Sequence, residues 1–208
     1  RDGDDVTVAL IDDDSAVLHS MRLLIESRDI SVACYESAEA FLEELPDSMP
    51  TCVVADVRMP GMTGLELQRE LKYRNLEAPL ILISGHADVS MAVQALKNGA
   101  FDFFEKPYDG ERFANSVTDA VQKARRQSTE QSERTDIAER LKALSPRQRE
   151  VLEFVAAGMS NKQIAAKLSI SPRTVETYRA WVMERIGAQN VADLVRKVSA
   201  LLPAEPPK

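Results

Sequence analysis

The chain has 208 residues, of which 44% are hydrophobic and 28% are charged, values that are typical of a globular protein. No apolar run approaches the ~20 residues of a membrane-spanning helix and no secretory signal opens the chain, so we expect a cytoplasmic protein without a membrane partner. The net charge of -7 is uneven, because residues 1–124 carry 23 acidic and 11 basic side chains whereas residues 142–203 carry 5 acidic and 10 basic.

Short β-like runs alternate with amphipathic helical patterns over residues 1–124. This alternation is typical of an α/β fold, and we predict a five-stranded, doubly wound parallel sheet with helices on both faces. The predicted strands are Val6–Ile11, Ile30–Cys34, Thr51–Ala55, Leu80–Ile83 and Phe101–Phe104. The predicted helices are Ser15–Arg28, Ala38–Leu45, Gly64–Arg74, Val89–Asn98 and Gly110–Arg126. Both cysteines, Cys34 and Cys52, fall inside predicted strands, where we expect small buried side chains and no disulfide or metal site.

Polar side chains stand where these strands end, and the carboxyl ends of parallel strands meet at one edge of a sheet. The residues concerned are Asp12, Asp13, Asp56, Ser84 and Lys106. Crowded carboxylates repel one another unless a proton or a cation lies between them, and a hard divalent ion, Mg²⁺ (or Mn²⁺), suits oxygen ligands. The set is suited to phosphoryl transfer onto a carboxylate, with Asp56 as the nucleophile and Ser84 and Lys106 contacting phosphoryl oxygens.

Two neighbours of this set have simpler interpretations. We expect Asp14 to be the N-cap of the first helix, because aspartate at a strand–helix turn often accepts hydrogen bonds from the first helical N–H groups. Phe103, in a predicted strand, is by itself most simply a core residue.

Residues 125–141 are polar and contain neither glycine nor proline, so we predict a helical linker between a domain at 1–124 and another at 142–208. A dimerising coiled coil would need more apolar heptad positions than this stretch offers.

The basic half is predicted to be four helices. Ser145-Pro146 and Ser171-Pro172 are typical of an N-cap followed by a first-turn proline, and Ser169–Ser171 forms the short connection that a helix-turn-helix requires. The predicted helices are Pro146–Ala157, Asn161–Leu168, Pro172–Ile186 and Val191–Leu202.

On the third of these helices, one face holds apolar residues that we expect to pack inward: Val175, Tyr178, Val182 and Ile186. The opposite face presents Arg173, Glu176, Thr177 and Ala180, with Arg179 beside it, a surface suited to DNA. A small helical bundle with a solvated basic face would show the same periodicity, so at this point both interpretations stay open.

Motifs in both halves resemble known families. "LIDDD", "VVADVRMPGMTGLEL", "LILISGHADV" and "FDFFEKPY" resemble the receiver domain of two-component response regulators over residues 5–124, and their wording is closest to the FixJ-like group. "LSPRQREVL", "GMSNKQIAAKL" and "SPRTVETYRAWVMERIG" resemble the LuxR/NarL-type DNA-binding domain over residues 142–203.

The receiver resemblance implies a flavodoxin-like fold and a role for each residue of the acidic set. Asp56 would accept phosphate from a sensor histidine kinase, and Ser84 and Lys106 would stabilise the phosphoryl group. The metal would be held by Asp12, Asp13, Asp56 and the backbone carbonyl of Arg58. Ser84 and Phe103 would form the switch that responds to phosphorylation.

The DNA-binding resemblance implies two kinds of contact. Glu176, Thr177 and Ala180 would face base edges, although alanine departs from family members with lysine at position 180, which weakens direct readout there. The residues that would mostly hold the DNA backbone are Lys162, Arg173, Thr174, Tyr178 and Arg179.

Together these resemblances imply a response regulator that is not an enzyme apart from Mg²⁺-dependent self-phosphorylation and autodephosphorylation. Phosphorylation is expected to release the C-terminal domain and drive homodimerisation, so that promoter DNA is bound and RNA polymerase is recruited. Activation of transcription is the expected outcome, with repression as the alternative. A phosphatase that turns over at Asp56 would need a neighbouring general acid, and Arg58 stands two residues beyond it. A receiver that works without phosphorylation is disfavoured by the complete set of acids, lysine and hydroxyl.

Overall fold

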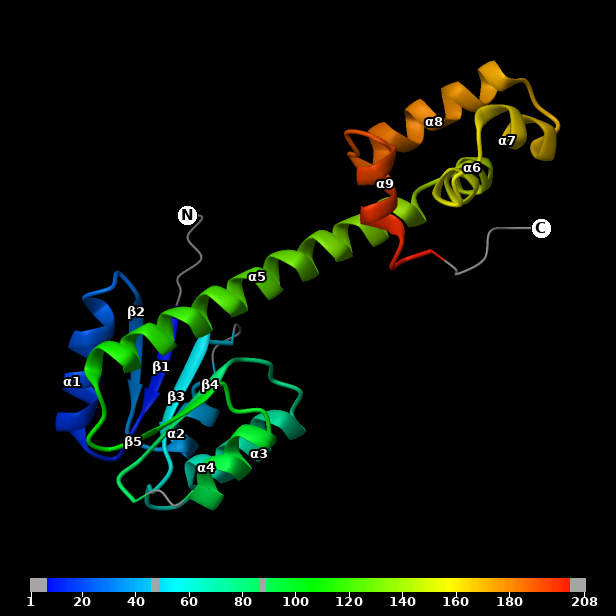
Figure 1. The fold of residues 1–208 in the computed structure, drawn as a ribbon. Coiled ribbons are helices and arrows are strands. Elements are labelled where there is room, and N and C mark those ends of the chain that lie inside the picture. The colour runs from blue at the N-terminus through cyan, green and yellow to red at the C-terminus, as the bar shows by residue number, and fades with distance from the viewer. Residues whose placement is uncertain (1–6, 46–48, 87–88, 203–208) are drawn as a thin grey trace. The chain divides into compact units, whose positions relative to one another are not determined.

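The computed structural model describes residues 7–45, 49–86 and 89–202, in two compact units whose boundary along the chain falls between Gln127 and Ser128 (Figure 1). The first unit contains five parallel strands in the order β2-β1-β3-β4-β5. The strands are β1 (Thr7–Ile11), β2 (Ser31–Tyr35), β3 (Cys52–Asp56), β4 (Leu80–Ser84) and β5 (Asp102–Glu105). The helices are α1 (Ser15–Glu26), α2 (Ala38–Glu43), α3 (Gly64–Tyr73), α4 (Val89–Lys97) and α5 (Gly110–Lys142). The doubly wound parallel sheet predicted from the sequence is confirmed.

The strand order reverses next to β1. The chain adds β2 on one side of β1 and β3, β4 and β5 on the other, so the loops that follow β1 and β3 diverge to opposite faces of the sheet. Three strands begin one residue later than predicted, and Asp56 and Ser84 are the last residues of β3 and β4 rather than the first residues after them. Val6, the predicted start of the first strand, lies outside the described residues.

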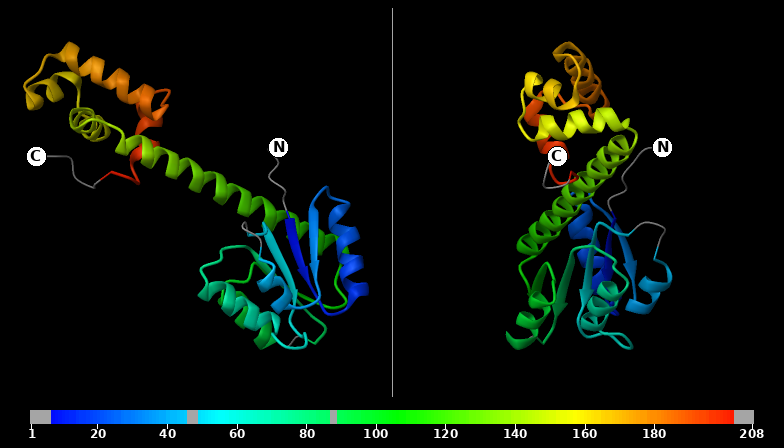
Figure 2. Two further views of the ribbon diagram at one scale, coloured as in Figure 1. Left: turned by 180° about the vertical axis from the view of Figure 1, so that it is seen from behind. Right: turned by 90° about the vertical axis from the view of Figure 1, so that its right-hand side faces the viewer.

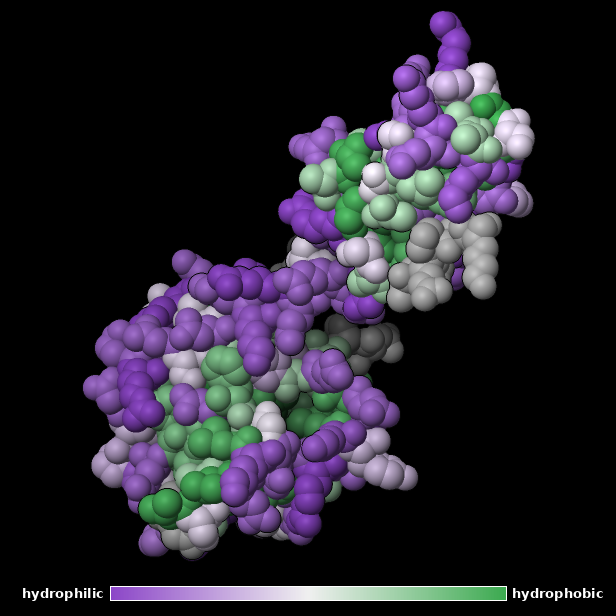
Figure 3. All heavy atoms as spheres, turned by 45° about the vertical axis from the view of Figure 1, so that its right-hand side comes forward, coloured by the Kyte–Doolittle hydropathy of each residue, from purple (hydrophilic) through white to green (hydrophobic). Residues whose placement is uncertain are grey.

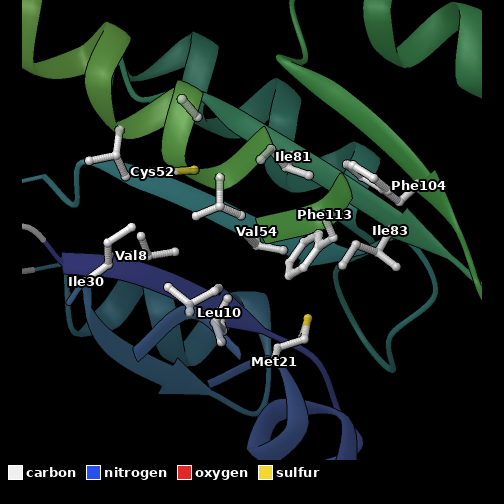
Figure 4. Close-up of a cluster of buried hydrophobic side chains, with 14 of the residues drawn as sticks. Val8, Leu10, Met21, Ile30, Cys52, Val54, Ile81, Ile83, Phe104 and Phe113 are labelled. Carbon is white, nitrogen blue, oxygen red and sulfur yellow. The ribbon is translucent and has the colours of Figure 1, made fainter. Parts of the chain in front are cut away.

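The sheet is buried on both faces because side chains alternate along each strand. One core cluster joins β1, β3, β4 and β5 to α1 and α5, and Figure 4 shows its side chains. The other cluster lies between the same strands and α2, α3 and α4 (Figure 2). In the first cluster Phe113 of α5 is fully buried and meets Phe104 of β5 edge-on, with ring centroids 5.5 Å apart.

The two cysteines differ, and the prediction for Cys34 was wrong. Cys52 lies in β3, where all five residues are buried, and burial raises the pKa of its thiol to about 12. Cys34 is exposed because β2 is an edge strand of the sheet. An edge strand packs against neighbours on one side alone, which the apolar run around Cys34 did not reveal.

Helix α5 runs without a break through the predicted linker, 125–141. All residues from 125 to 136 are exposed, and hydrophilic atoms (purple) cover this part of the helix in Figure 3. The change of unit falls inside this stretch, while the domain limits at 124 and 142 remain predictions. Among the described helices, α5 included, none combines the length and apolarity required to cross a bilayer.

The second unit is helical. It contains the end of α5 and α6 (Pro146–Ala156), α7 (Asn161–Leu168), α8 (Pro172–Ile186) and α9 (Val191–Val198). Ser145, Ser160 and Ser171 are the N-caps of α6, α7 and α8, each accepting a hydrogen bond from a backbone N–H of the first turn. The core is formed by one face of each helix, including Leu141, Leu152, Ile164, Val175, Val182, Ile186 and Leu194. The inward face predicted for α8 is confirmed, with Tyr178 partly buried at its margin.

Replacing Phe113 with alanine is expected to lower the free energy of unfolding of the first unit by about 3–5 kcal/mol, because a fully buried ring is lost between α5 and β5. Urea denaturation followed by circular dichroism measures this change. Asp119→Ala, at an exposed position on the same helix, should alter stability by less than about 0.5 kcal/mol. Equal effects of the two substitutions would contradict the packing described here.

Candidate functional site

Strand register brings the first two acids together. Ile11 of β1 pairs with Ala55 of β3, so the residues that follow, Asp12 and Asp56, lie side by side where the strand order reverses. Both are buried, Asp12 at 1% exposure and Asp56 at 6%. Open α/β sheets bind their ligands at this kind of position, outside the carboxyl ends of the strands.

Lys106 joins the two carboxylates. Ser84 of β4 pairs with Glu105 of β5, which places Lys106 one residue past the sheet, and its N–H donates to the Ser84 carbonyl at 2.8 Å. The Lys106 ammonium lies 2.8 Å from Asp12 Oδ2 and 2.7 Å from Asp56 Oδ1. One cation is therefore shared by two buried anions, and the cluster keeps an excess of negative charge.

Burial and pairing oppose each other in this cluster. Burial raises the pKa of Asp12 above its usual value, although hydrogen bonds from Lys106 and from the Asp14 N–H act to lower it. Burial also acts to lower the pKa of Lys106, but the hydrogen bonds to Asp12 and Asp56 outweigh it and hold that pKa above its usual value. The ammonium is thus stabilised by the pair, while Asp12 carries a desolvation cost that one shared cation does not remove.

The residues near the other strand ends differ in burial and in their contacts, beginning with the partner of Asp56. Its Oδ2 accepts a hydrogen bond of 2.6 Å from the Arg58 N–H, which fixes the carboxylate against the following turn. Ser84 is fully buried, and its Oγ accepts a hydrogen bond from the His86 N–H at 3.3 Å. Gly85 has open space where a side chain would stand. Asp13 and the Arg58 side chain are exposed, and Asp14 is the N-cap of α1, as predicted.

The donor atoms suit a hard divalent cation. The acids and the Arg58 backbone carbonyl offer oxygen alone, and the buried pair keeps more negative charge than Lys106 neutralises. In residues 7–45, 49–86 and 89–202, no three acidic, histidine or cysteine side chains stand together as a ready-made metal site, since Asp13 points to the surface while Lys106 holds the other two. The residues fit a metal by chemistry and charge, and the Lys106 ammonium lies between the two buried acids.

Phe103 is half-buried on β5 and packs against the cluster formed with α2, α3 and α4. It pairs with Leu82 of β4, and Leu82, Ser84 and Phe103 point to the same face of the sheet. Phe103 is therefore neither fully core nor free, and it lies on the face to which Ser84 also points.

Sequence reasoning missed two residues that shape the loop after β3. A Cβ atom on Gly64 would overlap the Asp56 carbonyl oxygen, so α3 can begin this close to the acid only with glycine. Glu39 of α2 accepts a hydrogen bond of 2.7 Å from the Met62 N–H, and this contact ties the loop after β3 to a neighbouring helix. The Thr63-Gly64 step, a helix N-cap followed by glycine, was the available signal for Gly64, whereas the partner of Glu39 depends on tertiary contact.

The second candidate surface belongs to α7, α8 and the turn between them. Lys162, Arg173, Glu176, Thr177 and Ala180 are all exposed. The other predicted DNA contacts are half-buried: Thr174, whose hydroxyl lies 2.8 Å from that of Ser171; Tyr178, whose ring meets Trp181 edge-on; and Arg179, which donates to the Asn161 side chain. The turn itself is tightened by Ser169 in the left-handed region, at φ 54°.

Several basic residues outside this surface are neutralised within their own helix. Arg147, Arg149, Arg196 and Lys197 each form an ion pair with an acid of the same helix. Within the described residues Lys162, Arg173 and Arg179 form no ion pair, so their charge is available to an external anion such as a phosphate.

A doubly wound sheet with a lysine-bridged acid pair at its switch point, followed by a basic helix-turn-helix unit, defines the class of two-domain response regulators. Residues 8–118 match the family described as response regulator receiver domain, and residues 142–198 match bacterial regulatory proteins of the luxR family. The chain belongs to the two-component response regulators with a LuxR-type DNA-binding domain.

Individual relatives agree with this assignment. The transcriptional regulatory protein FixJ of Bradyrhizobium diazoefficiens is 42% identical over 189 residues, 91% of this chain and 92% of that protein. The response regulator protein TodT of Pseudomonas putida is 40% identical over 194 residues, 93% of this chain and 86% of that protein. Among solved structures, the response regulator StyR has a TM-score of 0.79 at 31% identity, covering 93% of this chain and 98% of that one.

Replacing Asp12 with asparagine is expected to raise the free energy of unfolding at pH 7 in metal-free buffer, since Lys106 then pairs with Asp56 alone. The pKa of Asp12 is raised in the folded protein, so wild-type stability increases as the pH falls through that pKa toward the usual carboxyl value. The difference in free energy of unfolding between Asp12→Asn and wild type should therefore become smaller at acid pH. Urea denaturation at several pH values measures it, with exposed Asp13→Asn as the control; a variant less stable than wild type at pH 7 would contradict the charge imbalance.

Proposed function

We propose that Asp56 accepts a phosphoryl group from a sensor histidine kinase and that the resulting acyl phosphate controls promoter binding by the helical domain. The observation that carries this proposal is the Lys106 ammonium shared between Asp12 and Asp56 at the switch point of the sheet. An ion pair that only stabilises the fold needs one acid for one lysine. Here a second buried acid shares the lysine, so an incoming group can replace one of the two lysine contacts while the other is kept.

In the proposed reaction, a carboxylate oxygen of Asp56 attacks phosphorus. An O–P bond forms and the P–N bond of the kinase phosphohistidine breaks, with the imidazole leaving. Lys106 Nζ, already 2.7 Å from Asp56 Oδ1, would donate to one phosphoryl oxygen, and the Ser84 hydroxyl to another. The Arg58 N–H on Oδ2 keeps the carboxylate oriented. Mg²⁺ (or Mn²⁺), held by Asp12, Asp13, Asp56 and the Arg58 carbonyl, would supply the charge neutralisation that brings two anions together.

The switch is proposed to begin at Ser84. Among the described residues, the partner of its Oγ is the His86 N–H, and a phosphoryl group on Asp56 would offer the hydroxyl a stronger, charged acceptor. Movement of Ser84 toward Asp56 would free space on the face where Phe103 is half-buried, and the ring would turn inward to fill it. This changes the surface of α4 and β5, which we propose as the homodimer interface of the phosphorylated protein.

The output follows from the domain order. With a receiver at 1–124, a helical linker at 125–141 and a DNA-binding domain at 142–208, phosphorylation would release the second domain, and two copies would read two half-sites. We propose that the protein acts in the cytoplasm, binds promoter DNA and recruits RNA polymerase as an activator. Its chemistry is limited to self-phosphorylation from small phosphodonors and autodephosphorylation.

Asp56→Asn is expected to abolish phosphorylation, because an amide cannot act as the attacking nucleophile. Intact-protein mass spectrometry after incubation with Mg²⁺ and acetyl phosphate should show one added phosphate on wild type and none on the variant. Asp14→Asn is the matched control, since asparagine is an equally good N-cap for α1 and this position does not contact Lys106. A phosphate adduct on Asp56→Asn would refute the assignment.

Arg173→Ala is expected to weaken binding to all DNA sequences alike and to reduce the slope of log K against log salt by ~1, because one phosphate contact is lost. Fluorescence anisotropy over a salt series measures both effects. Arg185→Ala removes the same charge near the far end of α8 and should leave the slope unchanged. An unchanged slope for Arg173→Ala would move the DNA surface elsewhere.

A further inference from the structure

Glu176 is an acid on the surface proposed to bind DNA. It is exposed on α8, one turn after Arg173. Glu150, Glu153 and Asp193 are all neutralised by cations of their own helices. Across residues 142–202, all of them described, Glu176 and Glu184 are the acids without an ion pair. A free carboxylate next to phosphates is repelled unless it finds a hydrogen-bond donor on a base.

The next exposed side chains on this face, Thr177 and Ala180, add methyl groups and no free donor. The Thr177 hydroxyl donates to the Arg173 carbonyl at 3.2 Å, which leaves its methyl group and lone pairs facing outward. Ala180, one turn further on, is exposed and presents a methyl group. The nearby cation Arg179 is held by Asn161 of α7 and so lies off this face. From Glu176 to Ala180, this face of α8 therefore offers one strong acceptor followed by methyl groups, with the free cation Arg173 one turn before it.

The edges of the bases in the major groove decide what this surface can bind. Cytosine N4 is a lone donor, and a carboxylate accepts from it directly. Adenine also has a donor, but its N7 acceptor stands beside it and repels a carboxylate; guanine shows two acceptors. Methyl groups of threonine and alanine pack against the C5-methyl group of thymine. Glu176, Thr177 and Ala180 lie close together on one helix face and so reach neighbouring bases. Because cytosine and thymine are both pyrimidines, a single pyrimidine-rich strand satisfies both kinds of contact.

We propose that α8 reads a short pyrimidine-rich strand in the major groove, in which Glu176 accepts a hydrogen bond from the amino group of a cytosine and Thr177 and Ala180 pack against neighbouring thymines. This rests on the proposed function, in which the second helix of the helix-turn-helix enters the groove. Arg173 to Ala180 spans about 10 Å of helix, enough for roughly three base pairs. Discrimination comes from Glu176, while Arg173 and Lys162 hold the phosphates on either side.

The test is selection of binding sites from a random DNA pool with the full chain, with and without Mg²⁺ and acetyl phosphate. Wild type should select a half-site with cytosine at one position on a pyrimidine-rich strand. Glu176→Gln is nearly isosteric, and glutamine pairs with both N6 and N7 of adenine, so the same position should change from cytosine to adenine. The ratio of the affinity for the wild-type site to the affinity for the same site with adenine in place of that cytosine should be about 10-fold lower for the variant than for wild type.

Glu184→Gln is the matched control, because it removes the same charge from an exposed acid two turns further along α8. It should tighten binding to all sequences alike and leave the selected bases unchanged. A wild-type half-site without the cytosine, or an unchanged base at that position in Glu176→Gln, would overturn the proposal while leaving DNA binding itself intact. Selection of no motif by wild type in either condition would overturn the proposal and the proposed function together.

Discussion

The receiver depends on one constraint: two carboxylates are buried side by side at the carboxyl ends of two inner strands of the parallel sheet. Asp12 and Asp56 are brought together by the register of β1 and β3, and neither can be exposed without disrupting a central strand. A single lysine, Lys106, is shared between them. The surrounding features follow from this: Gly64 allows α3 to begin against Asp56, and the Arg58 N–H orients its carboxylate. The folded protein thus retains a charge imbalance that an incoming ligand can relieve, which is how a stable fold also becomes a receptive site.

The helical unit differs from the receiver, because DNA binding requires cations that are not neutralised by acids of the same chain. Arg147, Arg149, Arg196 and Lys197 are paired with acids of the same helix, three or four positions away. The basic residues of α7 and the first turns of α8 lack such partners within the described residues, and serine N-caps position both helices. Lys162, Arg173 and Arg179 therefore leave unneutralised positive charge on the surface formed by α7 and α8. The exposed Glu176 within that surface then acts as a selective element rather than as a counter-ion.

Most elements could be predicted because their signals are local. Asp14 was expected to cap α1, and Val175, Val182 and Ile186 were expected to face inward; both expectations are confirmed. The prediction that Cys34 is buried was wrong because an edge strand and a central strand can share the same apolar pattern. The pattern of a strand does not show its position in the sheet. The assignments of Asp56, Ser84, Lys106 and the DNA contacts are still predictions. Their geometry supports the roles proposed for them.

The sequence by itself determined the helices, strands, caps and the list of polar residues at strand ends, because periodicity and capping act over a few neighbouring residues. It also determined the family, through motifs that keep their order and spacing. Only the tertiary structure decided that one lysine serves both Asp12 and Asp56, that Glu39 anchors the loop after β3, and that Arg179 is held by Asn161. Each of these contacts joins residues from different elements. Their existence depends on strand order, register and helix packing, which are properties of the whole folded chain.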